Sequence, residues 1–331
     1  MSTATLHTAH LAFLGALLPD RPFELGPAPA DLPDDENLRS TIISQLSDGA
    51  GLVTAGGAEL TDLGDSLLRP LVSYDEAYWG MFLLHNERQP LTLQVPDEWL
   101  DFMKESLATA AMSSPRTYIL IARSGSVVTA AVRHQDRIDI TQFTAPRGLP
   151  IAAADYVLAL GDPQGVWKPL SIAPISLPVA ALNKHQPPPR PPATDAADRD
   201  HAQYRRYTYK FVQDLRSSVH LDPRAAATLT RLLTLDHVAS AQFMYSAGPQ
   251  RLTPAQSVSI DYFHDAGVAV SRPRRLGDGT IWKNISPAAH NAVAEAFDAL
   301  ASMPARPRNI IASATAANPA PDSVLRTQPQ H

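Results

Sequence analysis

One pattern occurs twice in this sequence and constrains its fold more than any single motif. Each copy has three short alternating strands followed by a helical pattern that begins near a proline; the first copy runs from Thr117 to Leu160 and the second from Ser257 to Leu300. Short alternating runs separated by a few turn residues are typical of antiparallel hairpins. We therefore predict an α/β (α+β) fold, in which a pseudo-two-fold duplicated antiparallel sheet is covered by helices.

Prolines mark where the helix of each copy is expected to begin. Pro150 opens the first, and Pro287 is placed at the first position of the second with Ser286 as its cap; proline is favoured there because the missing N–H has no helical partner anyway. The expected apolar faces hold Ile151, Ala154 and Leu158 in the first helix and Ala289, Val293, Phe297 and Leu300 in the second.

The composition excludes several classes of protein. Of the 331 residues, 44% are hydrophobic and 18% charged, which is enough apolar material for a core. The chain has no cysteine, so disulfides, thiolate nucleophiles and zinc–thiolate sites are excluded, in keeping with a reducing cytoplasm. The net charge of −5 argues against a general nucleic-acid or membrane-surface binder, and no apolar run is long enough to span a membrane.

Several elements are expected before the first copy. The apolar run His10–Leu18 is interpreted as a core helix and not a signal peptide, since it lacks a basic start and a cleavage site. A helix is expected to begin at Asp34, and another around Leu60 is expected to stop at Pro70. A strand is predicted at Tyr78–Leu84.

Proline-rich stretches divide the chain into parts. The segment 183–200 has the composition of an extended linker, and residues 304–331 are predicted to be a disordered tail. The two halves of the duplicated domain then span 1–182 and 201–303, and the second includes a helical pair at Tyr204–Val219 and Asp222–Leu235.

The sequence contains no convincing catalytic, cofactor or metal motif. Four glycines between Gly49 and Gly57 lack the spacing of a phosphate-binding loop, and the eleven histidines show no metal-binding spacing. Ser259, Asp261 and His264 are the residue types of a triad, but alternation places the first two on one strand face and His264 in a turn. We predict a protein that is not an enzyme, with an enzyme of unrecognised class as one alternative.

A basic and aromatic helix supports a second alternative. Tyr204, Tyr207, Phe211 and Leu215 fall on one stripe that is expected to face the core, with cations beside it. Interleaved aromatic and basic side chains can also bind nucleic acids, and Arg272, Arg274 and Arg275 form another small basic group. A nucleic-acid-binding regulator therefore remains open, although two such small basic patches on an acidic protein suit an acidic protein partner slightly better than a nucleic acid.

The order of these features resembles the EspG family, the cytoplasmic chaperones of ESX (type VII) secretion. The resemblance rests on Gly51-Leu52-Val53 after a helix, the leucine-spaced helix ending at Pro70, the strands TYILIAR and SVVTAAVRHQDRIDI, the ISLP segment, and QSVSIDYFHDAGVAVSRPR before the last helix. It implies a chaperone that binds the apolar tip of PE–PPE heterodimers, through the PPE subunit, and keeps them soluble. It implies no cofactor, small-molecule substrate, membrane or nucleic acid.

The resemblance also implies where the partner binds. The loop between early strands and the helices of the second half are implicated, which here correspond to His85–Met112 and Tyr204–Leu235. Large apolar residues in a polar connection are typical interface anchors; the alternative is that the helix predicted at Pro96–Ala111 packs on the sheet. The expected partner-binding residues are Asn86, Glu87, Arg88, Leu91, Leu93, Trp99, Phe102, Arg206 and Lys210.

Overall fold

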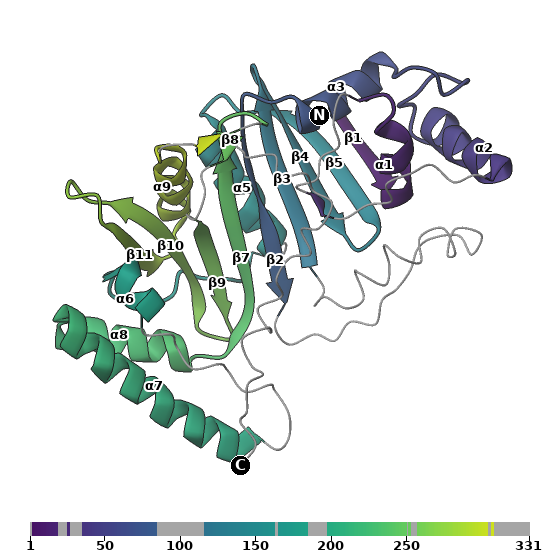
Figure 1. Cartoon of the computed structure of the whole chain (residues 1–331). Helices are drawn as coiled ribbons and strands as arrows, with labels where there is room; N and C mark the ends of the chain where they lie inside the picture. Colours follow the sequence, from purple (N-terminus) through teal and green to yellow (C-terminus); the bar gives the residue numbers. More distant parts are fainter. Residues whose placement is uncertain are drawn as a thin grey trace, which may run out of the picture.

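Among the described residues, a sheet of twelve strands, ten of them in one continuous order, forms the centre of the molecule and has helices on both faces (Figure 1). The computed structural model describes residues 2–18, 25–26, 35–84, 116–162, 165–184, 197–249, 251–252, 257–303 and 306–307. The strands are β1 (Ser2–His7), β2 (Glu76–Leu84), β3 (Arg116–Ser124), β4 (Val127–His134), β5 (Arg137–Thr144), β6 (Ile175–Pro178), β7 (His237–Ser246), β8 (Arg251–Leu252), β9 (Val258–Phe263), β10 (Gly267–Arg275), β11 (Ile281–Pro287) and β12 (Arg306–Pro307). The helices are α1 (Thr8–Leu14), α2 (Glu36–Ser44) with the π-helical turn η2 (Gln45–Gly49), α3 (Asp62–Val72), α5 (Leu149–Gly161), α6 (Val179–Lys184), α7 (Ala197–Val219), α8 (Pro223–Thr234) and α9 (His290–Ala301).

The strand order is symmetrical about the centre of the sheet. It reads β1-β5-β4-β3-β2-β7-β9-β10-β11-β6, with every neighbouring pair antiparallel, while β8 and β12 pair at the side of β7. The two halves meet where β2 pairs with β7 from Ala77 to Leu84, which is all of β2 except its first residue. The predicted duplicated antiparallel sheet is confirmed.

The duplication is longer than the sequence pattern indicated. In the part of the chain that the structure describes, each half has an edge strand, three α-helices, four antiparallel strands and a final helix, in that order. In the first half these are β1, α1–α3, β2–β5 and α5, and in the second they are β6, α6–α8, β7, β9–β11 and α9. The sequence pattern revealed only the last three strands and the last helix of each half.

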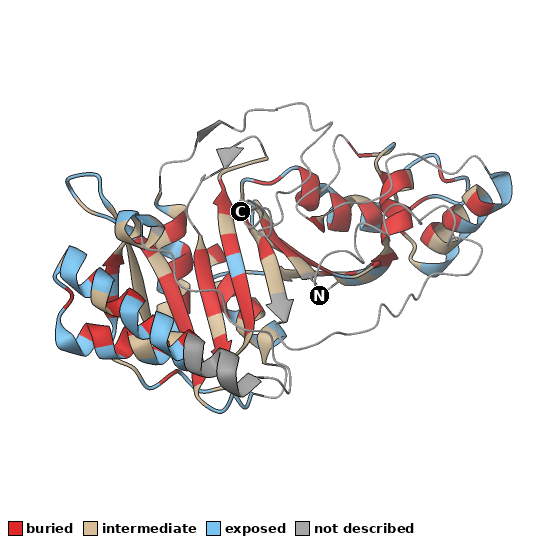
Figure 2. Ribbon diagram, turned by 60° about the horizontal axis from the view of Figure 1, so that its bottom comes forward, coloured by how far each residue is buried: buried red, intermediate tan, exposed pale blue. Residues whose placement is uncertain are grey.

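The helices form three groups, each over its own core. Helices α5 and α9 pack together on one face of the sheet. On the opposite face, α1–α3 cover the strands of the first half and α6–α8 cover those of the second (Figures 1 and 2). We call this second side the open face, because the described helices leave the central strands uncovered between the two groups.

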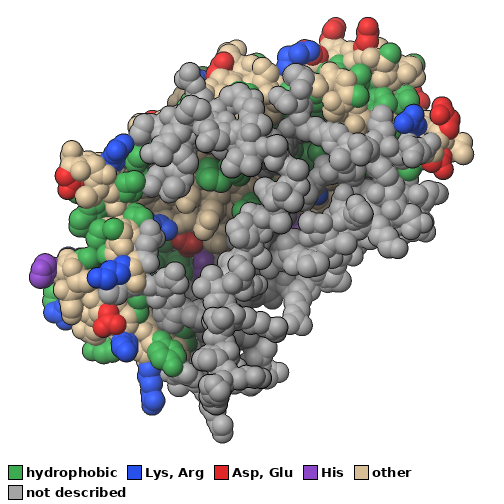
Figure 3. Space-filling model, viewed as in Figure 1, with side chains coloured by type: hydrophobic (Ala, Val, Ile, Leu, Met, Phe, Trp, Pro, Cys, Tyr) green, Lys and Arg blue, Asp and Glu red, His purple; other side chains and the backbone are tan. Residues whose placement is uncertain are grey.

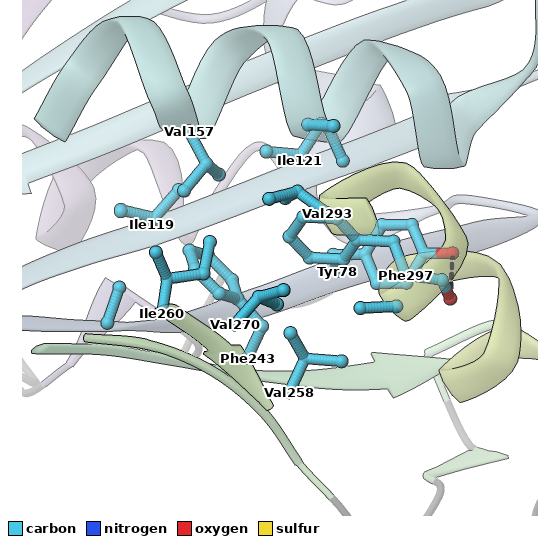
Figure 4. Close-up of a cluster of buried hydrophobic side chains, with 14 of the residues drawn as sticks. Tyr78, Ile119, Ile121, Val157, Phe243, Val258, Ile260, Val270, Val293 and Phe297 are labelled. Atoms are coloured by element: carbon cyan, nitrogen blue, oxygen red, sulfur yellow. Dashed lines mark hydrogen bonds between the residues drawn. The ribbon is translucent and has the colours of Figure 1, made fainter. Parts of the chain in front are cut away.

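The core beneath α5 and α9 connects the two halves (Figure 4). The ring of Phe297 from α9 lies 4.7 Å from that of Tyr78 on β2 and 5.3 Å from that of Phe243 on β7. The Tyr78 hydroxyl donates a hydrogen bond of 2.8 Å to the Phe297 carbonyl oxygen, and burial raises the pKa of this phenol. The aromatic cluster therefore stabilises the junction of the two halves.

The final helices begin differently from each other. In α5, Pro150 lies in the first turn as predicted, and Ala154 is buried, but Ile151 and Leu158 are only half-buried. In α9 the predicted start was wrong: Pro287 ends β11, opposite Ala269, and Ala289 is the cap of a helix that starts at His290. A proline can end a strand because that position needs no N–H donor. The predicted core residues Val293, Phe297 and Leu300 are buried.

The predicted stop at Pro70 was also wrong, because α3 continues through this proline to Val72. Proline cannot donate to the carbonyl four residues earlier, which here belongs to Ser66. The side-chain amide of Gln142 donates to that oxygen instead, at 2.7 Å. A side chain from the sheet thus replaces the missing hydrogen bond of the helix.

The described helices also occupy both ends of the segment predicted as the 183–200 linker. Helix α6 reaches Lys184 and α7 begins at Ala197. The intervening residues 185–196 lie outside the described residues, as does most of the 304–331 segment. The interpretation of these parts as a linker and a tail stays a prediction.

A buried histidine joins the first strand to the helices beside it. The His7 backbone N–H donates to Nδ1 of His10 at 3.1 Å, and Nε2 of His10 lies 2.8 Å from the Gln45 side-chain oxygen. Nδ1 accepts, so Nε2 carries the proton and the ring is neutral. His7 in turn contacts the carboxylate of Asp136, 3.2 Å away. Burial lowers the pKa of His10 to about 4.

We expect the protein to lose about 2 kcal/mol of stability between pH 7 and pH 5 through His10 alone. The unfolded chain binds a proton at this ring below about pH 6.5, whereas the folded protein does so only near pH 4, so stability falls as the pH falls. Urea unfolding at both pH values measures the loss. His10→Asn keeps an acceptor for the His7 N–H and removes the titration; it should reduce the loss, and the exposed control His134→Gln should not. An undiminished loss in His10→Asn would assign the effect to other groups.

Candidate functional site

The most unusual surface on the open face is a strip of large side chains at the centre of the sheet. Trp79 and Met81 on β2 lie opposite Met244 and Gln242 on β7. Alternation turns these four side chains to the open face, because Tyr78, just before Trp79, and Phe243, between Gln242 and Met244, belong to the core under α5 and α9. We call these four residues the central strip. Figure 3 looks onto this face and shows small hydrophobic patches between the two helical groups.

The two methionines of the strip are apolar residues that pack into no hydrophobic core of the described residues. Met81 and Met244 are half-buried and belong to none of the three hydrophobic clusters of the described residues. Gln242 is exposed between them, while Trp79 packs partly against the core under α1–α3. Flexible, polarisable methionines are common on surfaces that bind apolar partners. The strip therefore has the composition of a binding surface.

The indole Nε1–H of Trp79 is buried, and no described residue accepts a hydrogen bond from it. An unpaired buried donor costs about 1–3 kcal/mol.

The residue types of a catalytic triad do come close together, but not in a catalytic order. On β9, the Ser259 hydroxyl lies 3.4 Å from the Asp261 carboxylate, whose other oxygen lies 3.3 Å from Nε2 of His237. In a nucleophilic triad the imidazole lies between the hydroxyl and the carboxylate; here the carboxylate is in the middle, so the His237 ring is not placed to take the proton of Ser259. His264 is 61% exposed and pairs with Asp265 in its turn.

The basic and aromatic helix is largely placed as predicted. Tyr204, Phe211 and Leu215 of α7 are buried, and the Tyr204 hydroxyl donates to the Leu233 carbonyl oxygen at 2.8 Å, which ties α7 to α8. Tyr207 was wrongly assigned to the core, since it is 51% exposed. Thr208, one turn before Phe211 and Val212, takes the inward position instead.

Two of the predicted partner-binding residues can be located. Arg206 and Lys210 are exposed on α7, one turn apart. The other seven lie outside the described residues, as does the helix predicted at Pro96–Ala111; they are Asn86, Glu87, Arg88, Leu91, Leu93, Trp99 and Phe102. Their segment follows β2 directly in the chain, so it starts from a strand of the central strip.

The central strip was missed because β7 was not recognised in the sequence. The signal that was available is the run YWGMFLL in β2, which is apolar at odd and even positions alike. A strand with a single buried face alternates, so this run indicates that its second face also meets something apolar.

Among the described residues, no helix has the length and apolar character of a membrane-spanning helix.

Comparisons with known proteins agree with the fold and the earlier resemblance. The model of the EspG family matches residues 17–299. No curated protein sequence matches the chain. Among solved structures, the chain is similar to the Mycobacterium tuberculosis type VII secretion system chaperone EspG5, solved in complex with a PE25–PPE41 dimer. The TM-score is 0.57 at 14% identity, over 92% of this chain and 97% of the other. The family match covers most of the sequence, and this chain therefore belongs to the EspG family.

Proposed function

We propose that this protein is a cytoplasmic chaperone of type VII secretion that binds a PE–PPE heterodimer. Membership of the EspG family supports this function, and the similar EspG5 was solved with such a dimer. The central strip is the observation in this structure that carries the proposal, because it exposes apolar side chains where the two halves of the sheet meet. An apolar helical tip, presented by the PPE subunit, is the partner that suits it.

The physical role of the strip is to shield a partner and later release it. Methionine side chains adapt to different shapes at little cost, while the polar Gln242 limits how strongly the surface holds an apolar tip. The helical groups on both sides supply the polar rim that surrounds the apolar centre of an interface. Such shielding requires contact and no chemical step, which agrees with a protein that is not an enzyme.

The nine residues expected from the sequence extend this surface. Arg206 and Lys210 would contribute to the rim from α7. Leu91, Leu93, Trp99 and Phe102 would supply further anchors, and Asn86, Glu87 and Arg88 further rim contacts, from the segment that follows β2.

Co-expression with PE–PPE pairs encoded in the same genome tests the proposed function. We expect one pair to co-elute with this chain as a heterotrimer in size-exclusion chromatography, and its PPE subunit to be soluble only when the chain is present. If every pair elutes alone and its solubility does not change, the chaperone function is wrong for this protein.

A further inference from the structure

The two helical groups of the open face carry opposite charges. Residues 35–72, which contain α2 and α3, hold six carboxylates and two arginines, for a net charge of −4. Residues 204–234, which contain α8 and most of α7, hold six cations and two carboxylates, for a net charge of +4. We call the first the acidic layer and the second the basic layer.

Most of these charges are available to a partner. In the acidic layer, Asp35, Glu36, Asp48, Glu59 and Asp62 are exposed, while Asp65 pairs with Arg69. In the basic layer all six cations are exposed, and no described carboxylate lies within ion-pair distance of them. Those six are Arg205, Arg206, Lys210, Arg216, Arg224 and Arg231.

The central strip lies between the two layers. The acidic layer covers the strands on the β2 side and the basic layer those beyond β7 and β9, on the same face of the sheet (Figure 1). The whole sequence shows the same division, with a charge of −11 over residues 1–162 and +6 over 163–331. The two halves therefore have similar backbones but opposite net charges, which we call the charge antisymmetry.

We propose that this charge separation fixes the direction in which a partner lies across the central strip: its acidic end meets the basic layer and its basic end meets the acidic layer. The inference rests on the proposed function and adds the charge pattern of the partner. Complementary fields steer association and penalise the reversed arrangement, where like charges meet. Because the backbone is nearly two-fold symmetric about the strip, charge is what distinguishes the two directions.

The pattern favours a dipolar protein partner over a nucleic acid. A polyanion that binds the basic layer and continues across the strip would meet the exposed carboxylates of the acidic layer. Binding of an oligonucleotide in competition with the PE–PPE pair would overturn the proposal in favour of nucleic-acid recognition.

Charge reversal in each layer tests the proposal. The basic-layer variant is Arg205→Glu/Arg216→Glu/Arg224→Glu, and the acidic-layer variant is Glu36→Lys/Glu59→Lys/Asp62→Lys. The probe is the purified PE–PPE pair that co-elutes with the wild-type chain, and the readout is the association rate constant by stopped flow at about 50 and about 300 mM salt. We expect each variant to bind about 10-fold more slowly at low salt, with a weaker dependence on salt.

A second experiment, with charge reversals on the partner, tests the direction of docking. Reversing acidic residues at one end of the partner should restore fast association with the basic-layer variant and leave the acidic-layer variant slow. Asp298→Lys on α9, on the opposite face, is the control and should bind as fast as the wild type. Equal slowing by this control, or no effect of either layer, would refute the proposal while the wild-type chain still binds.

Two further outcomes separate the inference from the function on which it rests. If the wild-type chain binds no PE–PPE pair, the proposed function itself fails. If the wild-type chain instead self-associates at low salt and either reversal abolishes this, the two layers pair between copies of the chain and the proposed docking direction is wrong.

Discussion

Phe297→Ala is expected to lower the free energy of unfolding by about 3–5 kcal/mol. The side chain is fully buried and its ring contacts those of Tyr78 and Phe243, which come from the two strands at the centre of the sheet. Truncation leaves a cavity between α9 and the β2–β7 pair, which cannot collapse because the strands are held in register on both sides. The loss is large because one ring supports the junction of both halves.

Urea unfolding of the two proteins at neutral pH measures this effect. Tyr78→Phe is the matched control, since it removes only the hydroxyl that donates to the Phe297 carbonyl oxygen. This variant should lose about 1–2 kcal/mol, the cost of one buried hydrogen bond. A loss below about 1 kcal/mol in Phe297→Ala would mean that the junction does not depend on this cluster.

Met244→Arg is expected to weaken binding of the PE–PPE pair by about 30-fold or more, the effect of losing an interface hot spot of about 2 kcal/mol. The substitution places a charge among Trp79, Met81 and Gln242, where an apolar tip would have to cover it. Because Met244 belongs to no core cluster of the described residues, the fold should tolerate the change.

The control for this variant introduces the same charge on the other side of the sheet. Leu160 on α5 is 37% exposed, so Leu160→Arg should leave both binding and the melting temperature near their wild-type values. Calorimetric titration of the purified pair gives the affinities. Normal binding by Met244→Arg, with a normal melting temperature, would place the interface elsewhere.

The sequence predicted the two sets of hairpin strands better than it predicted the remaining strands and the ends of the helices. The short apolar runs and the turn residues between them identified β3–β5 and β9–β11, because strands joined by hairpins lie next to each other in the sequence. The other strands of the sheet were harder: β7 mixes Ser, Ala and Gln with aromatics, and β1 and β6 are short edges. Their pairing depends on partners far away in the chain, which a local pattern does not show.

The errors at helix ends have the same cause, which is contact with other parts of the chain. Pro70 is typical of a residue that ends a helix. The helix continues because Gln142, which lies 76 positions after Ser66, donates a hydrogen bond to the Ser66 carbonyl oxygen. Pro287 reads as a helix start, yet it completes the ladder with β10. In both cases tertiary pairing overrides a sound local rule.

The candidate site was predictable only in part. Its rim on α7 was expected from basic and aromatic spacing, and Arg206 and Lys210 are exposed there. The central strip joins Trp79 and Met81 to residues more than 160 positions away, and only the pairing of β2 with β7 brings them together. Its charge antisymmetry likewise becomes meaningful only when the two helical layers are known to share one face.

Hydroxyl-radical footprinting of the chain alone and with its PE–PPE pair would show which face of the sheet the partner covers. Methionine and tryptophan react readily, so Trp79, Met81 and Met244 report on the strip itself. We expect strong protection of these three residues in the complex and unchanged labelling of Tyr156 and Trp167, which belong to the opposite face. Protection of Tyr156 and Trp167, with the strip still labelled as in the free chain, would show that the partner binds the other face and not the central strip.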